Sequence, residues 1–408
     1  MGTDSIIYIR ADGNSKIATG HLVRCLSIAQ ELVKLHRKVC FLVSDKESKA
    51  LLETFLHSQN NKQNNAKKYL SNHQNLSAIP EKEHTNSRNR IHCGSNEITS
   101  DTIKTPNIDS ENRIQIQILS TAQYNDIEQE LPELCSILSL QKDPIFFLDS
   151  YFVTSAYFAT VKRYAKVVYL DDLMLFDYDA EMIINYDVIP KSALAKYQSF
   201  YHNANTLLLG AEYTPLRTQF QNRKVQLKPE MKHILITSGG SDPHCFCQNL
   251  VQYLIERNLP FVFHIVVGKF FTNTTELEKM AEIHSNIQIY ENITDMATLM
   301  EQCDGAVSAA GTTLYELCAL GIPTISFTMA DNQLTIGKVL EEVQAIPYAG
   351  DIRTDFHNVM EHICSFLIRM EKDFEKRKSA QHAMYGLVDG NGAKRIAQAV
   401  HSLSSFYH

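Results

Sequence analysis

Apolar residues recur with two different periods along the first 45 residues. Residues 5–12 (SIIYIRAD) alternate and are rich in β-branched side chains, which predicts a buried strand of a parallel sheet. Residues 21–36 then follow a helical period, and their apolar positions share one face: Leu22, Cys25, Leu26, Ala29, Leu32 and Val33. Residues 38–45 (KVCFLVSD) predict the next strand. This strand–helix–strand order predicts parallel pairing with a right-handed crossover.

This periodicity stops between residues 58 and 113. The segment holds eleven asparagines and a single aromatic residue, Tyr69. Such a composition cannot bury enough apolar surface to offset the entropy of ordering the chain. We therefore predict a disordered, Asn-rich insertion here, to which the sequence assigns no role.

The pattern resumes after the insertion and then occurs a second time. The first group of predicted strands covers residues 113–119, 144–152, 166–172 and 182–187. A polar passage leads to a second group, at residues 233–240, 261–268, 287–292, 305–310 and 323–328. Helical segments alternate with the strands in both groups. The sequence therefore predicts an α/β protein of two Rossmann-like domains, residues 1–212 and 213–408, facing a cleft at the carboxyl edges of their sheets. An amphipathic last helix, residues 392–403, is predicted to pack back across the domains.

Charge and cysteine usage exclude several classes of protein. A net charge of −7 argues against a surface for nucleic acid or anionic membranes. No run reaches the about 18 apolar residues of a membrane-spanning helix, and the N-terminus lacks a signal-peptide pattern. The nine cysteines lie mostly within apolar stretches, which is typical of reduced, buried thiols. His244, Cys245 and Cys247 lack a second cluster to complete a zinc site. We expect a cytoplasmic protein without a metal or cofactor.

The first strand-to-helix turn carries a candidate catalytic group. Gly20 permits close approach of a ligand, and His21 stands at the predicted helix N-terminus. The positive end of the helix dipole disfavours the imidazolium form there, so a ring facing the cleft is suited to act as a general base. A histidine that merely caps its own helix is the alternative.

Two similar connections in the second domain predict an anion site. Residues 238–243 (SGGSDP) end a strand and are predicted to open a helix near Pro243, where the amides around Gly239, Gly240 and Ser241 would bind a diphosphate. A well-capped connection explains Ser, Asp and Pro equally well, but it does not explain the paired glycines.

Residues 310–316 (AGTTLYE) repeat this arrangement. The functional interpretation places the amides of Gly311 and Thr312 on phosphate and the Glu316 carboxylate on ribose hydroxyls. The structural alternative is a capping box between Thr313 and Glu316.

Polar groups also follow several other strands. Asp331, Asn332 and Gln333 come directly after the strand at 323–328, where either ligand binding or helix capping by Asp331 accounts for them. In the first domain, Asp149 and the pair Asp171–Asp172 each follow an apolar strand. Caps and turns are the usual explanation, and the sequence leaves open whether Asp171 and Asp172 are catalytic or structural. The DxD at residues 177–179 favours a turn over a metal–nucleotide motif.

Taken in order, these motifs resemble one family. RADGNSKIATGHLVRCLSIAQEL, LDSY, LDD, LLLGAEYTPLR, SGGSDP, AAGTTLYELCALGIPTI and ADNQ are similar to the PseG/SpsG-like UDP-sugar hydrolases, relatives of the glycosyltransferase MurG. The resemblance covers nearly the whole chain apart from the insertion. It implies a GT-B fold and metal-independent hydrolysis of UDP-2,4-diacetamido-2,4,6-trideoxy-β-L-altrose, or a close relative, to UDP and free sugar in the biosynthesis of pseudaminic acid or a surface polysaccharide.

The resemblance also implies roles for individual residues. His21 takes the place of the catalytic base, and Tyr151 that of a tyrosine near the sugar, with Asp12 or Tyr151 orienting the water or the sugar. The implied substrate-binding set is Gly20, Arg24, Gly239, Gly240, Ser241, Gly311, Thr312, Thr313, Glu316, Asp331, Asn332 and Gln333.

The expected reaction inverts the configuration at the anomeric carbon, because the sequence offers no strong candidate for a second, nucleophilic group. A GT-B glycosyltransferase and a non-catalytic UDP-sugar binding protein are the alternatives. The expected partners are a UDP-sugar and water. We expect neither nucleic acid binding nor stable membrane insertion, and a monomer or weak homo-oligomer.

Overall fold

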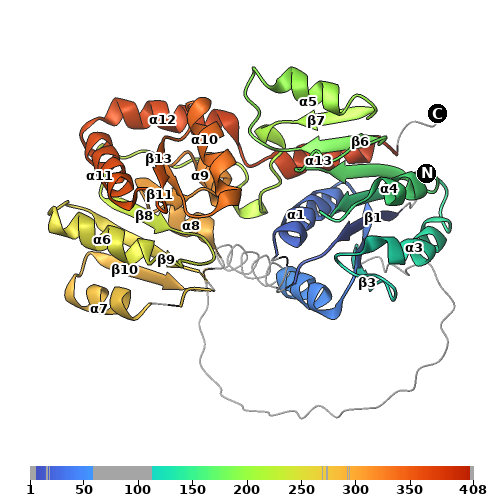
Figure 1. The fold of residues 1–408 in the computed structure, drawn as a ribbon, viewed down its shortest axis with the longest axis horizontal. Coiled ribbons are helices and arrows are strands. Elements are labelled where there is room, and N and C mark those ends of the chain that lie inside the picture. The colour runs from blue at the N-terminus through green and yellow to red at the C-terminus, as the bar shows by residue number, and fades with distance from the viewer. Residues whose placement is uncertain are drawn as a thin grey trace, which may run out of the picture.

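The protein is described here from a computed structural model that covers residues 6–14, 17, 19–57, 113–268, 270–272, 274–291, 293 and 295–404. The predicted insertion lies outside the described residues, apart from Arg113. Two parallel sheets, each with helices packed against it, form the two lobes in Figure 1.

The first sheet has seven strands in the order β3-β2-β1-β4-β5-β6-β7. Their bounds are β1 (Ile6–Ala11), β2 (Lys38–Val43), β3 (Ile114–Ile118), β4 (Ile145–Asp149), β5 (Lys166–Leu170), β6 (Met182–Asn185) and β7 (Thr206–Leu209). The helices of this part are α1 (Gly20–Lys34), residues 46–57, α3 (Leu131–Leu138), α4 (Ser155–Val161) and α5 (Leu194–Phe200). β1 and β4 are neighbours although 133 residues lie between the end of β1 and the start of β4, so the strand order reverses between them. A reversal of this kind leaves a crevice at the carboxyl edge of a sheet, where ligands bind.

The second sheet has six strands in the order β10-β9-β8-β11-β12-β13. The strands are β8 (His233–Thr237), β9 (Val262–Val267), β10 (Ile287–Glu291), β11 (Gly305–Ala309), β12 (Thr324–Thr328) and β13 (Tyr348–Asp351). The helices are α6 (Phe246–Glu256), α7 (Thr275–Ile283), α8 (Met296–Met300), α9 (Thr313–Leu320), α10 (Leu334–Glu342), α11 (Phe356–Lys372) and α12 (Phe374–Leu387). The order reverses again, here between β8 and β11.

The last helix, α13 (Gly392–Ser402), returns to the first sheet and packs along α1. Its apolar face buries Ile396, Ala397 and Val400. Just beyond the helix, Lys166 Nζ donates a hydrogen bond of 2.8 Å to the carbonyl oxygen of Leu403. This last described helix therefore packs against the first half of the chain, which ties the two lobes together.

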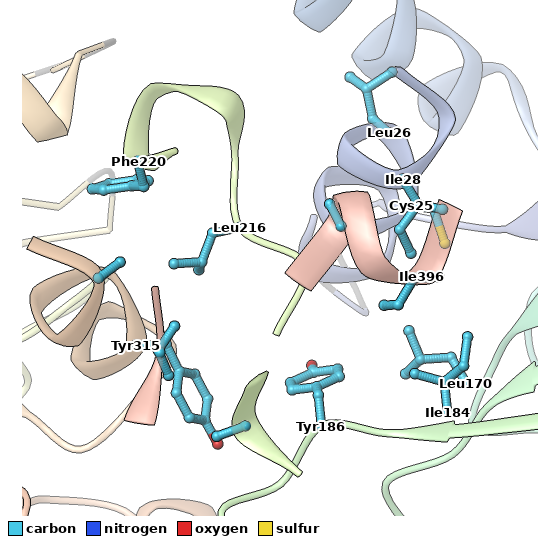
Figure 2. Close-up of a cluster of buried hydrophobic side chains, with 14 of the residues drawn as sticks. Cys25, Leu26, Ile28, Leu170, Ile184, Tyr186, Leu216, Phe220, Tyr315 and Ile396 are labelled. Atoms are coloured by element: carbon cyan, nitrogen blue, oxygen red, sulfur yellow. The ribbon is translucent and has the colours of Figure 1, made fainter. Parts of the chain in front are cut away.

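A buried apolar cluster joins the two lobes, and Figure 2 shows its centre. Tyr186 follows β6 of the first sheet, and Tyr315 lies in the first turn of α9. Their ring centroids are 6.2 Å apart in an edge-to-face arrangement. Leu216 and Phe220, from the segment that connects the two sheets, are part of the same cluster. The carboxyl edges of the two sheets therefore approach one another at this contact.

A pair of histidines on β8 and β9 of the second sheet makes the free energy of unfolding depend on pH. His233 Nδ1 lies 2.8 Å from His264 Nε2, and His264 Nδ1 lies 3.0 Å from the Tyr290 hydroxyl. Burial lowers the pKa of His264 to about 4, with a further contribution from His233 and an opposing one from Asp304.

The folded state therefore binds fewer protons than the unfolded state between pH 6.5 and about 4, and the free energy of unfolding falls as the pH drops through this range. One such group contributes a slope of up to about 1.4 kcal/mol per pH unit. Urea unfolding at several pH values is expected to show a shallower fall for His264→Gln than for the parent. Equal slopes would contradict this assignment.

Candidate functional site

His21 and Asp149 form a dyad where β1 and β4 end. His21 is the second residue of α1, which follows the loop after β1, and Asp149 is the last residue of β4. His21 Nδ1 lies 2.6 Å from Asp149 Oδ1. An ionised carboxylate can only accept hydrogen bonds, so the contact with Asp149 places a hydrogen on Nδ1, although Arg24 Nη2, also a donor, lies 3.0 Å from the same nitrogen. Nε2 is therefore left with its lone pair, as a general base requires.

The Asp149 carboxylate is held ionised by its donors. Arg24 Nε donates to Oδ2 at 2.6 Å, and Cys25 Sγ lies 3.3 Å from the same oxygen. Burial alone would raise the pKa of Asp149, but the charges and hydrogen bonds of Arg24 and His21 hold this pKa well below its usual range. A fixed anion behind the imidazole stabilises the imidazolium that forms when Nε2 takes a proton.

Tyr151 stands beside His21 on the loop after β4. The two rings meet edge to face with centroids 4.5 Å apart. The Tyr151 hydroxyl donates to Asp172 Oδ2 at 3.2 Å, and Arg24 Nη1 donates to the same oxygen at the same distance. Tyr151 remains 43% exposed, so much of its ring faces outward. Burial of the rest, together with Asp172, raises the pKa of the Tyr151 hydroxyl and keeps it protonated as a donor.

Asp12, just beyond β1, lines the same pocket as His21 and Tyr151. Arg10 Nη1 donates to Asp12 Oδ2 at 2.6 Å, and the Ser44 amide donates to Oδ1 at 2.7 Å. Arg10 is fully buried and also pairs with Glu130. The predicted catalytic residues His21, Tyr151 and Asp12 therefore lie together, and Asp12 is anchored on both oxygens.

Asp171 and Asp172, which the sequence could not assign as catalytic or structural, have different surroundings. Asp171 is fully buried and accepts hydrogen bonds from the Leu173 amide at 3.0 Å and from the Tyr201 hydroxyl at 2.8 Å. It shapes the loop after β5. Asp172 faces Arg24 and Tyr151 and belongs to the site. In the DxD segment, Asp177 accepts from Asn203 Nδ2 and Asp179 pairs with Lys162, and residues 177–179 form an irregular connection rather than the predicted turn.

The loop after β8 differs from its prediction. α6 begins at Phe246, three residues after the predicted start near Pro243. Asp242 causes this shift, because its carboxylate accepts hydrogen bonds from the amides of Phe246 and Cys247 at 2.8 and 2.9 Å. These first-turn amides are thus already satisfied. An anion at this loop would have to meet the backbone of residues 239–241 instead.

Three predicted-site glycines leave room for a ligand. Among the described residues, no heavy atom comes within 4 Å of a Cβ built on Gly20, Gly239 or Gly311. Gly239 also has a φ of +89°, in the region that favours glycine. A Cβ on Gly240 would meet only the Phe270 side chain, at 3.8 Å.

The loop after β11 lacks the capping box that was the structural alternative for Thr313 and Glu316. The N-cap of α9 is Thr312, without a side-chain cap, so Thr313 is the first helical residue. The Glu316 carboxylate accepts from Arg217 Nη2 at 2.7 Å instead. Burial raises the pKa of Glu316, and Arg217 opposes this. Arg217 was not among the predicted site residues; it lies in the segment that joins the two sheets.

After β12, residues 331–333 form a short 3-10 turn. Asp331 is exposed and pairs with Arg353 Nη1 at 2.8 Å rather than capping a helix. Gln333 Oε1 accepts from the Met329 amide at 2.9 Å, and Asn332 is exposed. The three segments predicted to bind UDP thus follow β8, β11 and β12 at one carboxyl edge. Their contact with a nucleotide stays a prediction, as does that of Arg24.

Comparison with known proteins bears on this arrangement. No family model matches the chain. The spore coat polysaccharide biosynthesis protein SpsG of Bacillus subtilis is 26% identical over 212 residues, which is 50% of this chain and 60% of SpsG. The pseudaminic acid cytidylyltransferase and UDP-2,4-diacetamido-2,4,6-trideoxy-beta-L-altropyranose hydrolase of Helicobacter pylori is 28% identical over 153 residues, 37% of this chain and 28% of that protein. The chain is thus similar to both proteins, over half of its own length or less. Its matches thus span less than two thirds of these relatives.

The fold is GT-B. The structure of Acinetobacter baumannii MurG superposes with a TM-score of 0.58 at 12% identity, over 98% of this chain and 99% of MurG. This likeness confirms the predicted fold class. Within the part of the chain that the structure describes, no helix is long and apolar enough to span a bilayer. Among the same residues, no three His, Cys, Asp or Glu side chains gather in a group that could hold a metal ion.

Proposed function

We propose that this protein is a UDP-sugar hydrolase that releases UDP and a free acetamido-deoxysugar. The observation that carries the proposal is the His21–Asp149 dyad, which lines one pocket together with Asp12 and Tyr151 and uses Nδ1, not Nε2, for the contact with Asp149. The names of the SpsG and Helicobacter pylori relatives support a UDP-sugar enzyme of polysaccharide or pseudaminic acid biosynthesis, and the second names the substrate class.

The proposed reaction is a single displacement. As a water oxygen bonds to the anomeric carbon, the bond from that carbon to the diphosphate oxygen breaks and UDP leaves with the electron pair. The water proton passes to His21 Nε2, and Asp149 stabilises the resulting imidazolium. Asp12, anchored by Arg10 and Ser44, or Tyr151 orients the water or the sugar. Inversion at the anomeric carbon follows from a single displacement.

The second domain would hold the nucleotide. The open space beside Gly239 and Gly311 suits close approach of a diphosphate to the backbone, and the N-terminus of α9 supplies partial positive charge there. Glu316, held by Arg217, is the proposed acceptor for ribose hydroxyls. These groups stabilise charge on the leaving diphosphate.

A glycosyltransferase is the second candidate, and one observation is compatible with it. Exposed apolar side chains flank the loops after β4 and β5, with Phe152 at 37%, Leu173 at 42% and Leu175 at 59% exposure. Such a rim suits the binding of an acceptor molecule as well as it suits a sugar.

The test is UDP release from UDP-2,4-diacetamido-2,4,6-trideoxy-β-L-altrose in buffer without any acceptor. The hydrolase is expected to form UDP and free sugar in equal amounts. UDP binding without release, followed by release when acceptor extracts are added, would support the transferase instead. Binding without release under either condition would point to a non-catalytic binding protein. The cytoplasmic location and the monomeric or weakly oligomeric state stay predictions.

A further inference from the structure

A continuous line of short contacts leads from His21 to the boundary between the two lobes. His21 Nδ1 lies 2.6 Å from Asp149, and Arg24 Nη2 lies 2.5 Å from the same carboxylate oxygen, Asp149 Oδ1. At its other end, Arg24 Nη1 lies 2.5 Å from the Tyr186 hydroxyl. The Tyr186 ring then meets Tyr315 of α9. Each member of this line except Arg24 is more than 90% buried, and the Arg24 side chain is 12% exposed.

Tyr186 links the two lobes in this series of contacts, because it contacts Arg24 in the first lobe and Tyr315 in the second. Its hydroxyl reaches into the first lobe toward Arg24, whereas its ring lies among the apolar side chains of the shared cluster (Figure 2). Tyr315, on the far side, directly precedes Glu316, the proposed ribose ligand. The contact between Tyr186 and Tyr315 therefore connects α9, which carries the proposed ribose ligand, with the residues that orient His21.

We propose that Tyr186 is a positioning residue that fixes the orientation of the His21 ring through Arg24 and Asp149. Because Tyr186 also packs against Tyr315, the orientation of the His21 ring depends on how the two domains pack together. Tyr186 touches neither the substrate nor the reacting atoms in this role. The expected effect on kcat rests on the proposed function, whereas the expected effect on the orientation of the His21 ring does not.

The physical reason lies in the hydrogen bonds of a nearly buried guanidinium. Without the Tyr186 hydroxyl, Arg24 Nη1 keeps only the longer contact of 3.2 Å to Asp172. A buried donor that loses an acceptor moves to recover one, because leaving it unpaired is costly. Arg24 holds both oxygens of Asp149, so its movement shifts the carboxylate that fixes the His21 ring. Residues that orient metal-binding histidines change activity by about tenfold to a hundredfold when they are replaced, and we expect an effect at the lower end of this range for His21.

The experiment compares Tyr186→Phe with the matched control Tyr315→Phe, which keeps the ring that Tyr186 contacts. The first readout is the NMR signal of the His21 Nδ1 proton in the protein without substrate, identified by its absence from His21→Gln. We expect a sharp, downfield signal in the parent and in Tyr315→Phe, and a broadened or lost signal in Tyr186→Phe. Tyr315→Leu, which removes the ring, is expected to weaken the signal as well.

The second readout is steady-state UDP release. Tyr186→Phe is expected to lower kcat by about tenfold with KM and the affinity for UDP unchanged, while Tyr315→Phe stays within about twofold of the parent. An unchanged Nδ1 signal together with unchanged kcat in Tyr186→Phe would overturn the inference and leave the hydrolase standing. If the parent itself releases no UDP, the proposed function fails, and the Nδ1 signal still decides the inference.

Discussion

Replacing Asp149 with asparagine is expected to lower both turnover and stability. Asparagine has almost the same shape, but it has no charge to offer His21 or Arg24. The orientation and stabilisation of the imidazolium would be lost, and we expect kcat to fall by about a thousandfold to ten-thousandfold. Removing one partner of a buried ion pair leaves the other charge uncompensated, so the free energy of unfolding is expected to fall by about 3–5 kcal/mol at pH 7. Urea unfolding and initial rates of UDP release measure the two effects.

A double variant separates the loss of turnover from the loss of stability. Arg24→Met combined with Asp149→Asn removes the whole ion pair, and it is expected to recover most of the stability but none of the activity. The pKa of Asp149 lies below its usual range in the folded state, so its contribution to stability is lost as the pH falls below about 4. The stability difference between the parent and Asp149→Asn should therefore narrow in acid. An Asp149→Asn protein as active as the parent would contradict the proposed role of the dyad.

His21→Gln is expected to lower kcat by about a hundredfold to ten-thousandfold, the usual contribution of a general base. Glutamine can still bond to Asp149, so stability is expected to change little. The proposed nucleotide site lies on the other domain, and the affinity for UDP, measured by titration calorimetry, should stay the same.

The matched control is His202→Gln, because His202 is exposed at the end of α5 and contacts Asp177 and a backbone carbonyl rather than the site. It should retain the parent rate. A His21→Gln protein that keeps full turnover, or one that loses UDP binding together with turnover, would contradict the assignment of His21 as a base acting on bound substrate.

Most of the fold could be predicted because its signals are local. Neighbouring residues alone predict the apolar strand β1 and the helix α1 with its single apolar face. The same holds for the strands and helices that follow residue 232. The start of α6 could not be predicted in this way. Both Asp242 as a cap and Pro243 as a first helical residue fit the sequence, and only the folded loop shows Asp242 reaching forward to Phe246 and Cys247.

The catalytic candidates could also be found in part. His21 is predicted by its place at the N-terminus of the first helix, whereas Tyr151 and Asp12 are implied by the resemblance to the PseG/SpsG-like hydrolases. The pairing of Asp149 with Arg24 could not be predicted, since 125 residues separate them and a carboxylate after a strand usually serves a turn. The same holds for Arg217 and Glu316, which are 99 residues apart. The signal that was present is the helical spacing of His21 and Arg24, which places both on one face of α1.

The most direct test of the central claim is hydrolysis in H₂¹⁸O, followed by mass spectrometry of both products and by NMR resolved for the two anomers. If water activated by His21 attacks the anomeric carbon, ¹⁸O will appear in the free sugar and not in UDP, and the first sugar formed will have the inverted configuration. Label in the UDP, or net retention at the anomeric carbon, would contradict the mechanism proposed here.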